Sequence, residues 1–344
     1  MNSTQIIALF FCVSIIVLVF FDVIKREKVE KNNFFSKEQT NWLRGIAILM
    51  VIHSHYFADI GISENFSGVP LFLVSSIGFL GVGLFIFMSG YATMISYVNK
   101  PNYLKRYIPK RIVRLYVPFL LSFIFFLGGM LCFGIYPTLD DWLAIPLMSL
   151  PHTLNWYLKI QLILYIVFYL LAVWIKKKPF IIMAMSIVCL IYTIIASSIG
   201  IQNYWFESVL LFPVGMAFAL YKIRITDFIL RKKVLNFVVS LFILAFTFLL
   251  YYYRGGVAFE IMFIFSFVLL SVNLCGIIIG TSKVLKWMGS MSLELYLSHI
   301  VFANTIMHYG NLFGNIWGYL LFMLGTILLG MGIHIISKKL IRVS

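Results

Sequence analysis

Residues 41–57 place three ionisable side chains in a segment that is apolar enough to enter a bilayer. The segment reads NWLRGIAILMVIHSHYF and contains Arg44, His53 and His55. Ionisable groups inside a membrane are costly, so they usually face a cavity or a partner. Histidine is a common general base near neutral pH, and arginine binds phosphate through paired hydrogen bonds. The combination is typical of proton transfer beside a bound anion.

The spacing of these residues decides which of them share a helix face. Arg44 and His55 are separated by about three helical turns, so a helix places them on one face, roughly 16 Å apart along its axis. His53 is rotated by about 200° from His55, so we expect it to pack against, or hydrogen-bond to, a neighbouring helix. Taken singly, Arg44 also fits a cytoplasmic anchor and either histidine fits a polar contact between helices.

A cation at the cytoplasmic end of this segment and a base three turns deeper suit an elongated donor. Acetyl-coenzyme A has that shape, because its phosphates lie far from its reactive thioester. Lys110, Arg111 and Arg114 enter a later apolar segment from the same side and add positive charge where phosphates would lie. That second cluster equally fits a purely topological role.

The elements that must position these residues are membrane helices. The chain is 62% hydrophobic and only 11% charged, whereas soluble domains carry about 25% charged residues. We therefore expect an all-α polytopic membrane protein with about eleven spans, each needing about 20 apolar residues. The predicted spans are 5–24, 42–60, 70–97, 111–134, 156–175, 179–199, 204–221, 234–253, 258–279, 290–309 and 315–337.

Basic residues alternate between the loops in a way that predicts orientation. Of the 27 Lys and Arg residues, all but Lys159 and Arg254 fall on one side of the predicted spans. Because cytoplasmic loops carry the excess of Lys and Arg, we expect the N-terminus outside and the C-terminus inside. The net charge of +15 is explained by this pattern and does not indicate a nucleic-acid partner.

The same pattern suggests how the chain is divided. Residues 1–40 form an N-terminal transmembrane anchor followed by a basic cytoplasmic linker, and residues 41–344 form one membrane domain. The segment 5–24 lacks a basic start and a cleavage site, so we expect it to be retained. The four cysteines lie in apolar runs without a CxxC pattern, so we expect neither a disulfide framework nor a metal site.

Four stretches in order carry a family resemblance. They are LRGIAILMVIHSHY with Arg44 and His55, GVGLFIFMSGY at 81–91, YIPKRIVRLYVP at 107–118 and WMGSMSLELYLSH at 287–299. NWYLKIQLILY at 155–165 and LLFPVGM at 210–216 fit more loosely. From about residue 41 to 337, the chain resembles the membrane acyltransferase-3 family.

The resemblance implies a fold and an activity. The fold is a ten-helix core, to which this chain adds one N-terminal helix. The activity is transfer of an acyl group, usually acetyl, from cytoplasmic acyl-coenzyme A to a carbohydrate hydroxyl at or beyond the outer face. The sequence leaves the acceptor open among capsule, O-antigen, teichoic acid, exopolysaccharide and small secondary metabolites, and the expected setting is a bacterial cytoplasmic membrane.

Individual roles also follow from the resemblance. Arg44 and His55 would be the essential pair, and Arg111 and Arg114 would belong to the donor-binding block. Ser89 would belong to the third-helix block and His299 would be a second family histidine. The chain departs from the family pattern at Asn41 and Gly83, where acidic residues are often found.

We interpret His55 as a general base that takes a proton from the acceptor hydroxyl. A covalent acyl-histidine is the variant left open. Glu294 would be an orienting carboxylate or, alternatively, make an interhelical hydrogen bond. Trp156 and Tyr157 would stack on a sugar or simply pack.

Two alternatives assign no chemistry to the chain. A polysaccharide or lipid-linked sugar transporter or flippase would suit buried ionisable residues in a multi-helix protein, although no paired broken helices are evident. A non-catalytic assembly or sensor subunit would keep the fold, but the intact Arg44 and His55 argue against it.

Overall fold

The computed structural model describes residues 29–59, 69–143, 145–148, 156–307 and 316–343, and all regular secondary structure in them is helical. The longer helices are α2 (Lys37–Asp59), α3 (Val69–Asn99), α4 (Tyr107–Cys132), α6 (Trp156–Trp174), α7 (Lys178–Ser198), α10 (Lys233–Arg254), α11 (Val257–Ile277) and α14 (Ile316–Val343). The shorter helices are α5 (Leu139–Leu143), α8 (Leu211–Leu220), α9 (Lys222–Arg231), α12 (Lys283–Ser290) and α13 (Ser292–Phe302). Single turns are η2 (Tyr103–Arg106), η3 (Ile145–Leu147), η4 (Asn203–Trp205) and η5 (Ala303–Met307).

Seven helical segments of the described residues are long and apolar enough to cross a membrane. They are Ile77–Asn99, Tyr103–Cys132, Trp156–Trp174, Lys178–Ser198, Lys233–Arg254, Val257–Ile277 and Trp317–Ile341. Each coincides with a predicted span, so the all-α, multi-pass character is confirmed. The predicted count of about eleven spans is not confirmed, because three of the other four segments do not qualify and the fourth, 5–24, lies outside the described residues.

Three predicted spans take other forms. Residues 42–59 of the segment 42–60 are helical and belong to α2. Polar side chains lower the mean hydropathy of this helix, so it is not among the seven candidate spans. Segment 204–221 yields only the ten-residue α8, and segment 290–309 yields the eleven-residue α13 followed by the π turn η5. At 1.5 Å per residue, α8 and α13 each cover only about half of a hydrocarbon core roughly 30 Å thick.

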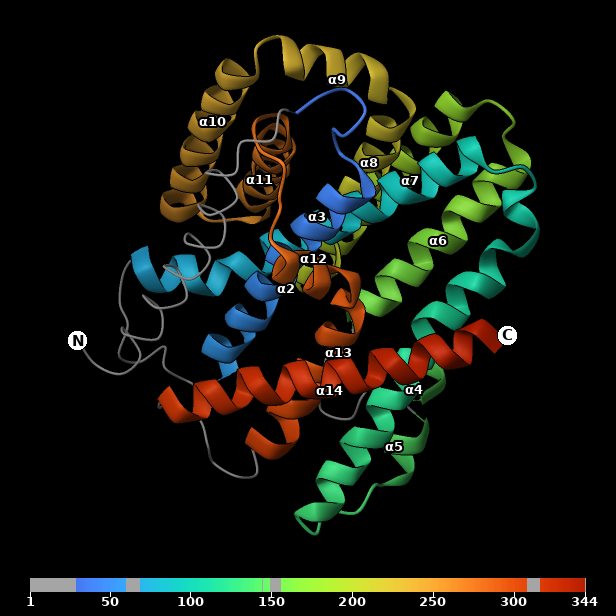
Figure 1. Ribbon diagram of the computed structural model, residues 1–344, viewed down its shortest axis with the longest axis vertical. Helices are drawn as coiled ribbons and strands as arrows, with labels where there is room; N and C mark the ends of the chain where they lie inside the picture. The colour runs from blue at the N-terminus through green and yellow to red at the C-terminus, as the bar shows by residue number, and fades with distance from the viewer. Residues whose placement is uncertain (1–28, 60–68, 144, 149–155, 308–315, 344) are drawn as a thin grey trace.

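Helix α3 lies at the centre of the molecule. It packs against α2, α8 and α11, and 78% of its spanning window is buried. Helix α10 is peripheral, because only 11% of its window is buried. In Figure 1 the arch of α8, α9 and α10 closes over α11, while α14 crosses the opposite half of the molecule.

Two glycines bring α2 and α12 into backbone contact. A Cβ atom on Gly45 would overlap the carbonyl oxygen of Leu285, and one on Gly289 would overlap that of Asn41. Only glycine permits so close an approach. Arg44 is the neighbour of Gly45, so this contact fixes where the arginine enters the core.

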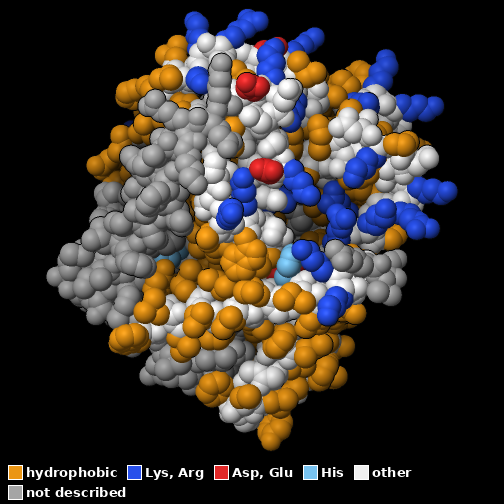
Figure 2. Space-filling view, viewed as in Figure 1, with side chains coloured by type: hydrophobic (Ala, Val, Ile, Leu, Met, Phe, Trp, Pro, Cys, Tyr) orange, Lys and Arg blue, Asp and Glu red, His pale blue; other side chains and the backbone are white. Residues whose placement is uncertain are grey.

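Charged and apolar side chains separate on the surface. Figure 2 shows Lys and Arg side chains gathered over the upper and right-hand part of this face, whereas its lower half is mostly hydrophobic. Large hydrophobic residues are widely exposed, including Phe242 on α10 and Trp174 at the end of α6. Such exposure is expected for helices that face lipid.

Candidate active site

Two histidines from distant parts of the chain lie side by side. The imidazole rings of His55 on α2 and His299 on α13 have centroids 5.0 Å apart. His55 is half-buried, whereas His299 is fully buried. The sequence suggests His299 as a second histidine, and the structure places it beside the first.

The hydrogen bond made by His299 defines its tautomer. Its Nδ1 lies 3.3 Å from the carbonyl oxygen of Leu295, which only accepts, so Nδ1 carries the hydrogen. The Nε2 atom is buried and has no hydrogen-bond partner among the described residues. A neutral His299 therefore presents a buried nitrogen lone pair at the position next to His55.

His53 faces a different neighbour. Its side chain is fully buried, and its Nδ1 lies 3.4 Å from the hydroxyl of Tyr319 on α14. The two rings meet edge to face with centroids 5.5 Å apart. The interhelical contact predicted for His53 is therefore confirmed.

Arg111 lies in a box of aromatic and hydroxyl side chains. Its guanidinium donates to Thr93 at 3.2 Å, to Tyr103 at 3.0 Å and to Tyr165 at 3.3 Å. It also lies 4.3 Å from the ring centroid of Tyr165 and 5.2 Å from that of Tyr107. These contacts combine cation–π attraction with hydrogen bonds and hold the guanidinium in one orientation.

One face of α6 connects this arginine to the histidines. Tyr157, Gln161 and Tyr165 are spaced four residues apart, so they share a helix face, which we call the α6 ladder. Ser89 Oγ lies 2.8 Å from the Tyr165 hydroxyl and accepts a 2.7 Å hydrogen bond from Gln161. The ladder extends roughly 12 Å along the helix axis.

The far end of the α6 ladder reaches the histidine pair. The ring centroid of Tyr157 lies 5.1 Å from that of Tyr296, which lies 5.4 Å from that of His299. A continuous row of side chains therefore joins Arg111 to His299 and His55.

Arg44 lies between the two ends of this row. It is partly buried and in electrostatic range of Tyr157, Tyr165 and Arg111. The ion pairs found among the described residues include neither Arg44 nor Arg111. Two neighbouring cations without a carboxylate partner are costly in a protein interior, so this arrangement favours an anionic ligand.

Other residues singled out in the sequence lie apart from this row. The side chains of Lys110 and Arg114 are exposed, although Arg111 on the same helix is enclosed. Trp156 packs beside Tyr204, with ring centroids 5.5 Å apart. The described residues hold no group of three or more His, Cys, Asp or Glu side chains suited to a metal ion.

Glu294 makes the interhelical hydrogen bond. Its carboxylate accepts from His334 Nδ1 on α14 at 2.9 Å. His299 follows Glu294 by five positions, a rotation of about 140° on a helix, so the two side chains leave α13 on different faces. An orienting contact between this carboxylate and His299 is therefore not what the structure shows.

Several site residues were missed in the sequence. Thr93, Tyr103 and Tyr107 surround Arg111 but resemble ordinary residues of an aromatic-rich membrane protein. Gln161 and Tyr165 had a usable signal, because a polar glutamine interrupts an apolar helix at one turn from two tyrosines. Pairing them with Ser89 required the three-dimensional packing of α3 against α6.

The comparisons with known proteins identify a family. Residues 38–335 match the acyltransferase domain that defines the acyltransferase-3 family. Comparisons with curated proteins and with solved structures gave no significant match. The matched region covers most of the chain and contains Arg44, His55, Arg111 and His299. The chain therefore belongs to the acyltransferase-3 family.

Proposed function

We propose that this protein is a membrane O-acyltransferase that moves an acetyl group from acetyl-coenzyme A to a hydroxyl of a cell-surface carbohydrate. The observation that carries the proposal is the row of side chains from Arg44 and Arg111 to His55 and His299. One end is cationic and lacks a carboxylate partner among the described residues, and the other end holds two imidazoles.

The cationic end suits the phosphates of the donor. Arg111 is already oriented by Tyr103 and Tyr165, so little side-chain entropy is lost when it binds phosphate. The α6 ladder is long and narrow, as is the pantetheine arm of coenzyme A. The thioester would then lie near Tyr296 and the two histidines.

The imidazole end suits general-base catalysis. Neutral His55 takes the proton of the acceptor hydroxyl while the hydroxyl oxygen attacks the thioester carbonyl. The carbon–sulfur bond breaks, an ester bond forms, and the histidine returns the proton to the departing coenzyme A thiolate. We assign His299 as a positioning residue, because its ring lies beside that of His55.

The proposed setting is a bacterial cytoplasmic membrane with the N-terminus outside and the C-terminus inside. The one-sided distribution of Lys and Arg supports this orientation, and it puts the donor end of the site on the cytoplasmic side. The acceptor would approach from the outer side, where Trp156 and Tyr157 offer aromatic faces to a sugar.

The test is acetyl transfer by the intact protein. Purified protein in vesicles is supplied with acetyl-coenzyme A, and release of free thiol is measured with and without surface glycan from a strain lacking the gene. We expect glycan-dependent thiol release and a glycan mass gain of one acetyl group per modified sugar. Movement of glycan across the membrane without thiol release would favour a flippase instead.

A further inference from the structure

A second feature lies away from the candidate active site. Helices α8, α9, α10 and α11 line an open groove with a volume of about 870 Å³, which we call the α8–α11 groove. Phe87 of the central helix α3 forms part of its inner wall. The row of side chains that we assign to catalysis contributes nothing to its lining.

The lining of the α8–α11 groove is hydrocarbon. Its few polar side chains are satisfied by the backbone: Ser240 donates to the carbonyl of Phe237, Thr247 to that of Ile243, and Asn273 to that of Leu269. Ser266 pairs with Thr247 at 2.7 Å. Ordered water needs two to four polar partners, so this lining favours an apolar occupant over water.

The length of the groove matches one leaflet of a bilayer. Met262 and Asn273 both line it and lie on the same helix. The residues between them correspond to roughly 16 Å of helix, about half of a hydrocarbon core that is roughly 30 Å thick. An occupant of this length is a lipid chain that belongs to a single leaflet.

One end of the groove is strongly basic. Phe228 is 69% exposed where α9 closes the groove, and Asn236 ties the two helices together by donating to the Phe228 carbonyl at 3.2 Å. Arg231, Lys232 and Lys233 form the corner between α9 and α10, which we call the basic corner.

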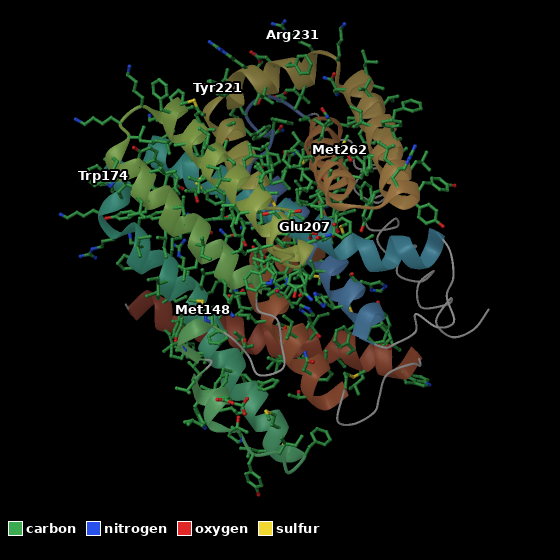
Figure 3. The ribbon with its side chains drawn as sticks, turned by 180° about the vertical axis from the view of Figure 1, so that it is seen from behind. Met148, Trp174, Glu207, Tyr221, Arg231 and Met262 are labelled. Carbon is green, nitrogen blue, oxygen red and sulfur yellow. The ribbon has the colours of Figure 1, made fainter. Side chains whose placement is uncertain are left out.

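The charge of the basic corner is not cancelled by the acid on α9. Asp227 lies 2.5 Å from Lys31, which already neutralises it. Figure 3 places Arg231 at the top of the arch and Met262 well below it on α11, so the charge marks one end of the groove. An apolar channel with a cationic end complements a lipid that has a negatively charged headgroup.

We propose that the α8–α11 groove binds an anionic phospholipid, with its acyl chains against α10 and α11 and its phosphate at the basic corner. The lipid fills a space that α10, with little buried surface of its own, leaves open beside α8 and α11. This site is separate from acyl transfer, so its test does not depend on catalytic activity.

The experiment measures which lipid stays bound. Full-length protein is reconstituted in vesicles of equal parts phosphatidylglycerol and phosphatidylcholine, extracted in mild detergent and weighed by native mass spectrometry. We expect one phosphatidylglycerol to be retained in preference to phosphatidylcholine. The triple variant Arg231→Gln, Lys232→Gln and Lys233→Gln should lose that preference, by roughly fivefold for each charge removed.

Two further variants separate the groove from the general surface. The double variant Val239→Trp with Met262→Trp places two large side chains in the groove at partly exposed positions. We expect it to reduce the amount of retained phosphatidylglycerol at least tenfold, which corresponds to roughly the loss of one good contact. Phe242→Trp with Tyr253→Trp changes exposed positions outside the groove, and replacement of Lys176, Lys177 and Lys178 by Gln removes a different basic cluster. Both controls should behave as wild type.

The outcomes that overturn the proposal are specific. Equal retention of both lipids by the wild-type protein would show that the protein retains only bulk bilayer lipid. Equal losses of phosphatidylglycerol in the groove variants and the control variants would show the same. Melting curves identify a misfolded tryptophan variant. In that case the charge variant, whose substitutions lie at the surface corner, decides the question alone.

Discussion

His55 and His299 lie with their ring centroids 5.0 Å apart, although 243 positions separate them in the sequence. The first is carried by α2 and the second by α13, and these helices pack directly against each other. The two imidazoles differ in their surroundings. His299 is buried and its Nδ1 donates to the carbonyl of Leu295, whereas His55 is half-exposed.

In the proposed mechanism the half-exposed His55 is the base. We expect His55→Ala to abolish acyl transfer while the protein is still made and inserted, because the variant lacks the base that takes the proton from the acceptor hydroxyl. The measurement is glycan acetylation in cells with matched membrane levels of each variant. His53→Ala is the control: it removes a side chain that contacts Tyr319 on α14, and it should keep substantial activity. An active His55→Ala variant together with an inactive His53→Ala variant would show that His53, and not His55, is the base.

Arg111 and Arg114 form a second matched pair. Arg111 is held by Thr93, Tyr103 and Tyr165, whereas the side chain of Arg114 is exposed. Losing a charge-assisted phosphate contact costs about 1.5–3 kcal/mol, so Arg111→Ala should weaken acetyl-coenzyme A binding roughly 10- to 150-fold. For Arg114→Ala we expect the affinity for acetyl-coenzyme A to change by less than about fivefold, because exposed charges contribute little to binding. Binding to the purified proteins measures both, and equal losses would contradict the assignment.

The contact between α2 and α12 predicts a stability effect. Gly45→Ala would push a methyl group into the carbonyl of Leu285, and overpacking of this kind costs about 1–3 kcal/mol. Gly128→Ala on α4 is the control, because a Cβ there meets nothing within 4 Å. Alanine favours helix over glycine by roughly 1 kcal/mol, so this control should be neutral or stabilising. Thermal melting in detergent compares the two, and an unchanged Gly45→Ala would disprove the close contact.

A buried carboxyl group predicts a pH effect. Glu207 lies in the connection between α7 and α8, outside the seven candidate spans, and is 2% exposed. Burial, and then the neighbouring Glu260, raise the pKa of Glu207 from 4.5 to about 9. The folded protein therefore keeps a proton that the unfolded chain releases, so stability should fall as pH rises from 4.5 to about 9.

Glu207→Gln tests this directly. The amide cannot titrate, so the melting temperature of the variant should depend less on pH than that of the wild-type protein. Glu38→Gln is the control, since Glu38 is exposed and pairs with Lys286 at the surface. A pH dependence as steep in Glu207→Gln as in wild type would contradict the prediction.

Most of the fold could be predicted from hydropathy, and the predictions that were not confirmed have physical explanations. Seven long segments were predicted correctly, because an apolar run of about 20 residues in lipid can satisfy its backbone hydrogen bonds by forming a helix. The reading of segments 204–221 and 290–309 as full spans is not confirmed, because the helices α8 and α13 within them are shorter. Hydropathy does not report that a helix such as α13 is surrounded by other helices, nor that it changes to the π turn η5 after Phe302.

The site was predicted in part for a similar reason. Helical spacing correctly separated His53 from His55, because both lie on one regular helix. Spacing did not separate Arg111 from Lys110 and Arg114, which share its basic run but have exposed side chains. What selects Arg111 is the aromatic box contributed by η2, α4 and α6, and contacts between distant segments leave no local pattern.

The contrast between the enclosed α3 and the peripheral α10 has a consequence for membranes of different thickness. A bilayer that is too thin or too thick acts on the helices that touch it, which respond by tilting. Helix α10 has 11% of its spanning window buried and would absorb such a mismatch, whereas α3, with 78% buried, is insulated by its neighbours. Ser89 and Thr93 lie on α3, so the geometry around Arg111 should tolerate changes in lipid chain length that reorient the rim of the protein.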